Sequence, residues 1–220
     1  MWQFKLNLDS VKLHRHNTVM KRNYHHGDLA NTLVESAVSL IQSKGLAKLS
    51  LREVARAAGV SHAAPAHHFG DKAGLLTAVA VAGFALLERT LNHSLASASQ
   101  TAEAQLINTG AAYIRFALSH PAYFEVMFRP ELINDQSTAY ALAAQAPRKI
   151  LKQCIREFFF AKSPGHSVSD HQVEVTVIAL WSQVHGFASL WLNGNFGDPA
   201  DLKLLDKILL DMLSSITLSL

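Results

Sequence analysis

Apolar residues recur every three to four positions in nearly every long segment of the chain, and no long segment alternates between apolar and polar residues. The first spacing is typical of helices with one face in a core, whereas alternation would be typical of strands. One such segment extends from residue 28 to Lys44, and Gly45 ends it. Its apolar face comprises Leu29, Leu33, Ala37, Leu40 and Ile41. The pattern predicts an all-α protein with about nine helices.

A short helix, a tight turn and a second short helix are predicted next. Ser50 and Glu53 have the spacing of a capping box, in which the hydroxyl and the carboxylate satisfy backbone N–H groups at a helix start. Gly59 provides the left-handed conformation that ends this helix. We expect Ser61 to cap the second helix, which places Pro65 in its fourth position, at the edge of where proline is tolerated. Two short helices joined in this way form a helix-turn-helix.

Capping residues, glycines and prolines divide the rest of the chain into six further helices. One of them ends before Ser163, and we place Pro147 at its start or at a kink. The other five are predicted over about 71–98, 102–119, 121–129, 168–193 and 199–218.

Basic residues are concentrated toward the N-terminus. Residues 1–75 hold ten Lys and Arg against five Asp and Glu, whereas the remaining residues hold ten against twelve. Such a segment is typical of a polyanion contact, and a solvated basic surface explains it equally well. Together with the helices, it predicts a disordered or mis-annotated extension over residues 1–20, a helix-turn-helix domain over 21–75 and a second helical domain over 76–220.

The overall composition is that of a globular protein. With 49% hydrophobic and 17% charged residues, the chain is too apolar to be disordered, and its net charge of +3 is too small for coating nucleic acid. Cys154 is the one cysteine, so a reducing, cytoplasmic location is expected. The uncharged stretch 175–197 contains several polar residues, which favours a helix buried against protein over a membrane span.

A set of motifs, taken in order, resembles the TetR/AcrR family of transcriptional repressors. The motifs are Tyr24-His25-His26-Gly27-Asp28-Leu29, Ser50-Leu51-Arg52-Glu53-Val54-Ala55, Ala58-Gly59-Val60-Ser61 and His68-Phe69-Gly70-Asp71-Lys72. Trp181, His185 and Gly186 are similar to a subgroup with a Trp-His-Gly signature in its C-terminal domain. The resemblance implies a homodimer that places one helix-turn-helix per protomer in a major groove and holds a small-molecule effector in the C-terminal domain.

The resemblance also points to candidate DNA contacts. Positive side chains would neutralise phosphates and give salt-dependent affinity, whereas the second helix of the motif would contact base edges. The phosphate candidates are Lys21, Arg22, Arg52 and Lys72. The remaining candidates are Ser50, Ser61, His62, Ala63, His67 and His68.

Ala66 departs from the family pattern, which usually has a tyrosine there whose hydroxyl is expected to hold a phosphate. We expect His62 and His67 to donate instead, because a protonated imidazole binds phosphate better than a neutral one. Operator binding should then strengthen below about pH 6.5. For His68, packing and capping is the favoured interpretation.

Aromatic and sulfur-containing side chains of the middle helices are candidates for ligand contact. At helical spacing such residues more often form core, and the sequence does not sort them. His185 follows Trp181 by one helical turn, so it is expected either to hydrogen-bond a mostly apolar effector or to bond a backbone carbonyl in the core. The candidates are Tyr113, Phe116, Phe124, Met127, Phe128, Phe158, Trp181 and His185.

The helices predicted over 168–193 and 199–218 carry more apolar surface than one face of a domain needs. Pairing both with their symmetry mates would form a four-helix dimer interface. A two-fold dimer also matches the symmetry of a palindromic operator.

These observations predict a ligand-responsive repressor: a homodimer on double-stranded operator DNA, released by a small effector, with no cofactor, metal or membrane. The alternative, prompted by Ala66 and Pro65, is a helical small-molecule-binding or scaffold protein with weakened DNA binding. A hydrolase that uses the histidines is disfavoured because no motif pairs a nucleophile with a base, so the chain is not expected to be an enzyme. His25 and His26 lack the partners of a metal site, and Cys154 is expected to pack rather than to sense redox state.

Overall fold

The computed structural model describes residues 29–96, 101–134, 136–165 and 167–218. These residues form nine α-helices, two short 3-10 helices and no strand, which confirms the all-α prediction. The α-helices are α1 (Leu29–Lys44), α2 (Leu51–Ala58), α3 (Ala64–Phe69), α4 (Lys72–Leu95), α5 (Ala102–Ser119), α6 (Pro121–Met127), α7 (Thr138–Lys162), α8 (Asp170–Leu192) and α9 (Leu202–Leu218). The 3-10 helices are η2 (Leu46–Lys48) and η3 (Pro130–Leu132).

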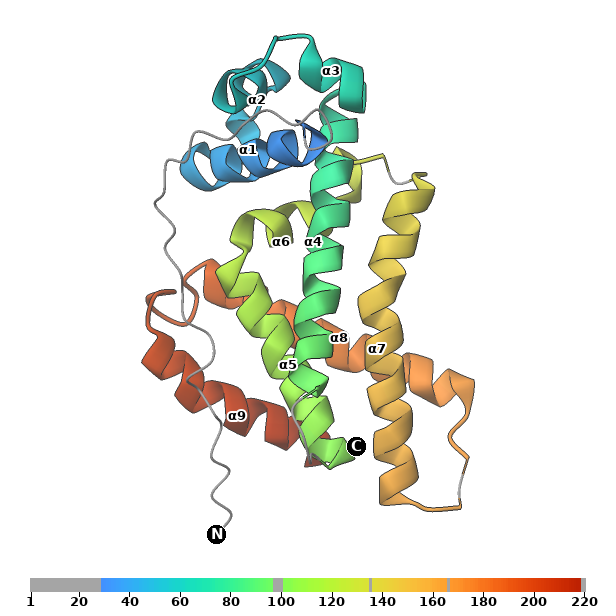
Figure 1. Cartoon of the computed structure of the whole chain (residues 1–220). Coiled ribbons are helices and arrows are strands. Elements are labelled where there is room, and N and C mark those ends of the chain that lie inside the picture. The colour runs from blue at the N-terminus through green and yellow to red at the C-terminus, as the bar shows by residue number, and fades with distance from the viewer. Residues whose placement is uncertain (1–28, 97–100, 135, 166, 219–220) are drawn as a thin grey trace.

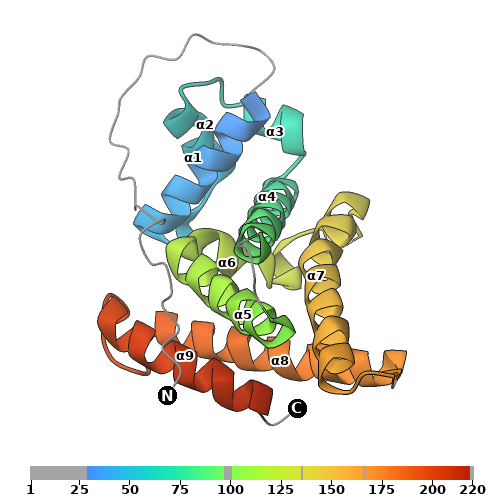
Figure 2. The ribbon, with the colours of Figure 1, turned by 60° about the horizontal axis from the view of Figure 1, so that its bottom comes forward.

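The helices form a small head and a larger body. Helices α1, α2 and α3 make up the head at one end of the molecule, and α4 runs from it into the body (Figure 1). The body comprises α4–α9, in which α5 packs against α4, α8 and α9. In the view of Figure 2, α8 and α9 lie at the end of the body away from the head.

Local signals in the sequence set the boundaries of α2. The hydroxyl of Ser50 accepts a hydrogen bond from the backbone N–H of Glu53 at 3.2 Å, as the capping motif predicts. The Glu53 carboxylate accepts from Lys44 Nζ of α1 at 2.9 Å, which ties α2 to α1. Gly59 ends α2 with φ of 69° and ψ of 31°, the predicted left-handed conformation.

The predicted start of α3 is wrong. The helix begins at Ala64 after a turn, its N-cap residue is Ala63, and no side chain of the described residues caps it. Ser61 instead starts the turn, and its carbonyl accepts from the N–H of Ala64 at 3.0 Å. The later start places Pro65 in the first turn, where a missing N–H costs nothing because helical residues there have no intrahelical acceptor.

Helix α4 approaches two neighbours closely at glycines. Asp71 caps it as predicted, since its Oδ1 accepts from the N–H of Gly74 at 2.8 Å. A Cβ on Gly74 would stand 1.9 Å from the Phe69 carbonyl oxygen, so α4 presses directly on the end of α3. A Cβ on Gly83 would stand 2.6 Å from Met127 Sδ, so the Met127 side chain of α6 packs directly on the middle of α4.

Helix α7 starts earlier than its proline suggested. It begins at Thr138, and Ser137 accepts from the N–H of Tyr140 at 3.4 Å. Pro147 lies inside the helix, so the alternative that placed it at the helix start is wrong.

One hydrophobic core runs from the head into the body. It joins Leu33 and Val54 of the head to Leu87, Phe116 and Trp191 of the body. A smaller cluster between α5, α7 and α8 contains Leu106, Cys154, Ile155, Phe158, Val173, Val177 and Leu180. Cys154 packs there with 2% of its surface exposed, and burial raises the pKa of its thiol.

Helices α4 and α8 are long and apolar enough to cross a membrane by length and composition. The central helix of a globular protein has the same composition, and α4 carries nine buried residues, seven of them within this core. Their composition is therefore weak support for a membrane span.

Candidate nucleic-acid interface and ligand pocket

Helices α2 and α3 lie at one end of the molecule (Figure 1), and they and the residues around them carry the predicted DNA contacts that the structure describes. Ser61, His62, Ala63, His67 and His68, which form the turn and α3, are all exposed. At the helix starts, Ser50 and Arg52 are exposed and Lys72 is half-buried. Lys21 and Arg22 lie outside the described residues, as do His25 and His26.

Positive charge in the head is only partly compensated. Glu53 forms ion pairs with Lys44 at 2.9 Å and with Arg56 at 3.5 Å. The hydrogen bond from Lys44 holds the pKa of Glu53 below its ordinary value, so this carboxylate is ionised at neutral pH. Arg52 and Lys72 form no ion pair with any described residue. Their charges therefore face solvent or an external anion.

The histidines of α3 lie beside the departure from the family pattern. Ala66 is exposed and offers a methyl group where the family's tyrosine would offer a hydroxyl. The rings of His67 and His68 meet edge to face at 5.6 Å between centroids. His68 also contacts the Phe69 ring at 6.1 Å, which fits a packing role for its side chain.

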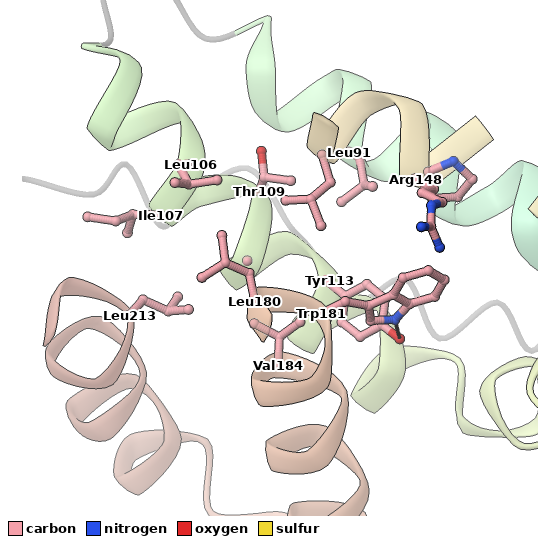
Figure 3. A pocket seen from close by; sticks show the side chains of 13 residues that line it. Leu91, Leu106, Ile107, Thr109, Tyr113, Arg148, Leu180, Trp181, Val184 and Leu213 are labelled. Carbon is pink, nitrogen blue, oxygen red and sulfur yellow. Dashed lines mark hydrogen bonds between the residues drawn. The ribbon is translucent and has the colours of Figure 1, made fainter. Parts of the chain in front are cut away.

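A pocket lies among α4, α5, α7, α8 and α9 of the body (Figure 3). It is a narrow cavity of about 60 Å³ that is partly open to solvent. The residues that line it are Leu91, Leu106, Ile107, Thr109, Gly110, Tyr113, Pro147, Arg148, Leu151, Leu180, Trp181, Val184 and Leu213. This lining suits a mostly apolar molecule.

A chain of hydrogen bonds connects the pocket wall to His185. Trp181 Nε1 donates to the Tyr113 hydroxyl at 3.2 Å, and that hydroxyl lies 2.9 Å from His185 Nδ1. Burial raises the pKa of Tyr113 and lowers that of His185, so both groups are neutral. The indole N–H can only donate, whereas the direction of the bond between the Tyr113 hydroxyl and Nδ1 depends on the imidazole tautomer. His185 is thus one hydrogen bond behind the pocket wall.

Two rings from the α6 region pack on His185. The ring centroids of Phe124 and Phe128 lie 5.0 Å and 4.7 Å from that of the imidazole. Phe128 also meets the Trp181 ring at 6.1 Å. Because α6 also contacts α1 and α4, this aromatic cluster connects the pocket wall to the helices that lead to the head.

The eight predicted ligand residues therefore fall into three groups. Tyr113 and Trp181 line the pocket, whereas Phe124, Phe128 and His185 form the cluster beside it. Phe116, Met127 and Phe158 are buried in the hydrophobic clusters of the core.

Most residues that line the pocket, including Arg148, were not predicted from the sequence. The aliphatic residues come from five helices, and their spacing matches that of ordinary core residues. For Arg148 the sequence held no distinguishing signal, because an arginine one turn from Leu151 is ordinary on an amphipathic helix. Among the described residues, no group of three or more His, Cys, Asp or Glu side chains is arranged to hold a metal ion.

Comparisons with known proteins agree with this arrangement. Residues 33–79 match the profile of bacterial regulatory proteins of the tetR family, and residues 106–213 match that of the tetracyclin repressor-like C-terminal domain. A search of curated proteins gave no match.

Solved structures share the fold over nearly their whole length. A protein of unknown function from Rhodococcus sp. RHA1 is 29% identical, with a TM-score of 0.75 over 91% of this chain and 99% of that one. The TetR family transcriptional regulator PfmR from Thermus thermophilus is 18% identical, with a TM-score of 0.62 over 84% and 96%. The fatty acid degradation regulator FadR from Bacillus halodurans is 13% identical, with a TM-score of 0.67 over 87% and 96%.

A helix-turn-helix head joined by one continuous helix to a larger helical body defines a class of DNA-binding transcription regulators. The two matched profiles describe the two parts of such a regulator, and the second covers most of the pocket. The chain belongs to the TetR family of bacterial transcription regulators.

Proposed function

We propose that this protein is an effector-responsive repressor of the cytoplasm: a homodimer that binds a palindromic operator and leaves it when a small, mostly apolar molecule fills the pocket. Residues 21–75 contact DNA, and residues 76–220 dimerise and hold the effector. The observation that carries the proposal is the path of α4. Only two residues separate this helix from α3, and its Leu91 lines the pocket, so one helix joins the two sites.

Helix α3 and the turn before it would enter the major groove. Their exposed side chains would meet base edges, while Arg52 and Lys72, which lack carboxylate partners among the described residues, would pair with phosphates. Lys21 and Arg22 would add phosphate contacts. The Ser50 hydroxyl already caps α2, so its part would be to position the helix start that carries Arg52.

An uncharged face of α8 supports the dimer. Val175 and Ile178 are 52% and 58% exposed and lie one turn apart on α8, and Leu190, near the end of the same helix, is 44% exposed. Leu202 at the start of α9 is 50% exposed. Isolated apolar side chains on a surface are ordinary, but a row of them on one helix is typical of an interface. Pairing α8 and α9 with their symmetry mates would bury this row.

His185 would report occupancy of the pocket. It bonds Tyr113 of the pocket wall, and the rings of Phe124 and Phe128 cover it. This role would also explain the Trp-His-Gly signature and supports membership of that subgroup. We expect His185→Ala to abolish the response to effector while leaving operator affinity unchanged, and an unchanged response would count against this role.

The effector would act by shifting a population. If it binds better to dimers whose heads are wrongly spaced for the operator, its binding energy favours that state and lowers DNA affinity. By linkage, DNA lowers the affinity for the effector by the same factor.

The test is a gel shift with DNA from upstream of the gene and its neighbours, over a salt series and with unrelated competitor DNA. A repressor protects a palindrome and loses affinity steeply with salt, because phosphate contacts release counterions. Arg52→Gln should flatten this slope. Arg156→Gln makes the same charge change on α7, far from the head, and should leave the slope unchanged.

Binding no tighter than to unrelated DNA, by a folded dimer, would contradict the proposal and favour the alternative of a helical binding protein. Ala66→Tyr would then show whether a missing phosphate contact is the cause. A second measurement concerns His62 and His67: at fixed salt, affinity should be higher at pH 6 than at pH 8. The double variant His62→Ala/His67→Ala should lose that difference, whereas a flat profile in the unmodified protein would exclude the histidines as phosphate donors.

A further inference from the structure

The polar chemistry of the pocket is concentrated at one end. Arg148 is the one charged residue of the lining and lies beside Trp181 and Tyr113 (Figure 3). The two hydroxyls of the lining are already engaged within the protein. Thr109 donates to the Gln105 carbonyl at 2.8 Å, and the Tyr113 hydroxyl bonds Trp181 and His185. The guanidinium therefore offers the unused hydrogen-bond donors of the pocket.

Positive charge is in excess at this end. Arg148 and Lys152 of α7 both form ion pairs with Glu174 of α8. The hydrogen bonds from Lys152 and Arg148 hold the pKa of Glu174 below its ordinary value, so the carboxylate is ionised. Two cations then share one anion, which leaves one positive charge at the rim. The Arg148 side chain is 37% exposed, so a ligand can reach its free N–H groups.

The rest of the lining offers hydrocarbon. Leu106, Ile107 and Leu213 lie toward the end opposite Arg148, with Leu180 and Val184 in between (Figure 3). A ligand that satisfies both ends has an anionic group at Arg148 and an unbranched apolar body that reaches toward Leu213.

We propose that the pocket binds an alkyl carboxylic acid, with its carboxylate on Arg148 and its chain directed toward Leu213. A guanidinium pairs with a carboxylate through two parallel N–H···O bonds, which a neutral hydroxyl cannot accept. That this acid acts as the effector rests on the function proposed above, whereas its binding does not.

The experiment is isothermal titration calorimetry of the full chain, without DNA, against saturated acids of six to sixteen carbons and the matched 1-alkanols, all below their micellar concentrations. A charge-assisted pair favours the acid over the alcohol of equal length by roughly tenfold to hundredfold. Each added methylene that is buried raises affinity by about fourfold until the chain fills the pocket.

Two variants of α7 separate the pocket from general charge effects. Arg148→Gln should remove the preference for acid while keeping the affinity for alcohol. Arg156→Gln is the matched control, because Arg156 also bridges α7 to α8, through Asp170 at 2.7 Å, but does not line the pocket. It should keep the full preference. Glu174→Gln frees Arg148 from its carboxylate partner and should tighten acid binding several-fold, so a gain as well as a loss is measured.

Equal affinity for acid and alcohol in the unmodified protein, no binding at any chain length, or a preference that survives in a folded Arg148→Gln protein would each overturn the proposal. Gel shifts with the same acids keep the two proposals apart. An acid that binds with the expected preference and leaves an operator complex intact refutes its role as effector, not its binding. If neutral molecules alone release the operator and no acid binds, the proposal that the pocket binds a carboxylic acid is refuted, whereas the proposed repressor function is supported.

Discussion

The Tyr113 hydroxyl is the centre of the hydrogen-bonded group behind the pocket, and Tyr113→Phe removes it without changing the ring. The hydroxyl accepts from Trp181 at 3.2 Å and bonds His185 at 2.9 Å, and Tyr113 is only 6% exposed. Both partners are half-buried, so water can satisfy them only in part. At about 1 kcal/mol for each lost bond, the free energy of unfolding should fall by about 2 kcal/mol.

Urea denaturation at fixed protein concentration measures this difference through the midpoint and the slope. The control is Tyr123→Phe, which removes the hydroxyl of a half-buried tyrosine that makes no hydrogen bond with the described residues. It should change the free energy of unfolding by less than about 0.5 kcal/mol.

A double-mutant cycle with His185→Leu then isolates the bond between Tyr113 and His185. Because the two side chains interact directly, their effects should depart from additivity by at least about 0.5 kcal/mol. Additive effects, or a Tyr123→Phe protein as destabilised as Tyr113→Phe, would refute the argument that these hydrogen bonds stabilise the pocket wall.

Three further outcomes follow from other parts of the structure. Gly59→Ala should destabilise the protein by about 1–2 kcal/mol in the same urea assay, because φ of 69° places a Cβ in the unfavourable left-handed region. If the proposed dimer pairs through α8, Ile178→Asp should give monomers by light scattering, whereas Leu142→Asp, on α7 and 61% exposed in the native protein, should not. Burial lowers the pKa of His185, so as the pH falls the imidazole binds a proton in the unfolded chain before it does so in the folded protein. The free energy of unfolding should therefore fall as pH decreases below about 6.5, and less so in His185→Gln.

Features that depend on a few neighbouring residues were predictable from the sequence. Ser50, Gly59 and Asp71 act as helix boundaries as predicted, because capping and the left-handed conformation depend on local chemistry. Ser61 also had the residue type of a cap, yet α3 starts at Ala64. Pro65 explains the difference, since only a later start places it where its missing N–H has no consequence.

The pocket was less predictable because its walls meet only after folding. Tyr113 and Trp181 were predicted ligand contacts because they are aromatic. Phe116, three residues after Tyr113 on α5, was predicted for the same reason, yet it lies in the core with 2% exposure. Which side of a helix faces a cavity depends on how five helices pack, and no local signal carries that information. Arg148 stood out in neither charge nor motif, because a single arginine on an amphipathic helix usually lies on the solvated face.

Because α4 is long, a small rotation of this helix in the body produces a larger displacement at the head. At 1.5 Å per residue, Leu91 in the pocket wall lies about 29 Å along the helix from Lys72 at its start. A five-degree tilt pivoted near Leu91 would displace Lys72 sideways by about 2.5 Å, close to half the rise of a helical turn. At Gly74 and Gly83, α4 lies directly against the end of α3 and against the Met127 side chain of α6. Under the proposed function, a ligand that displaces the far end slightly would misalign a side chain against a base pair.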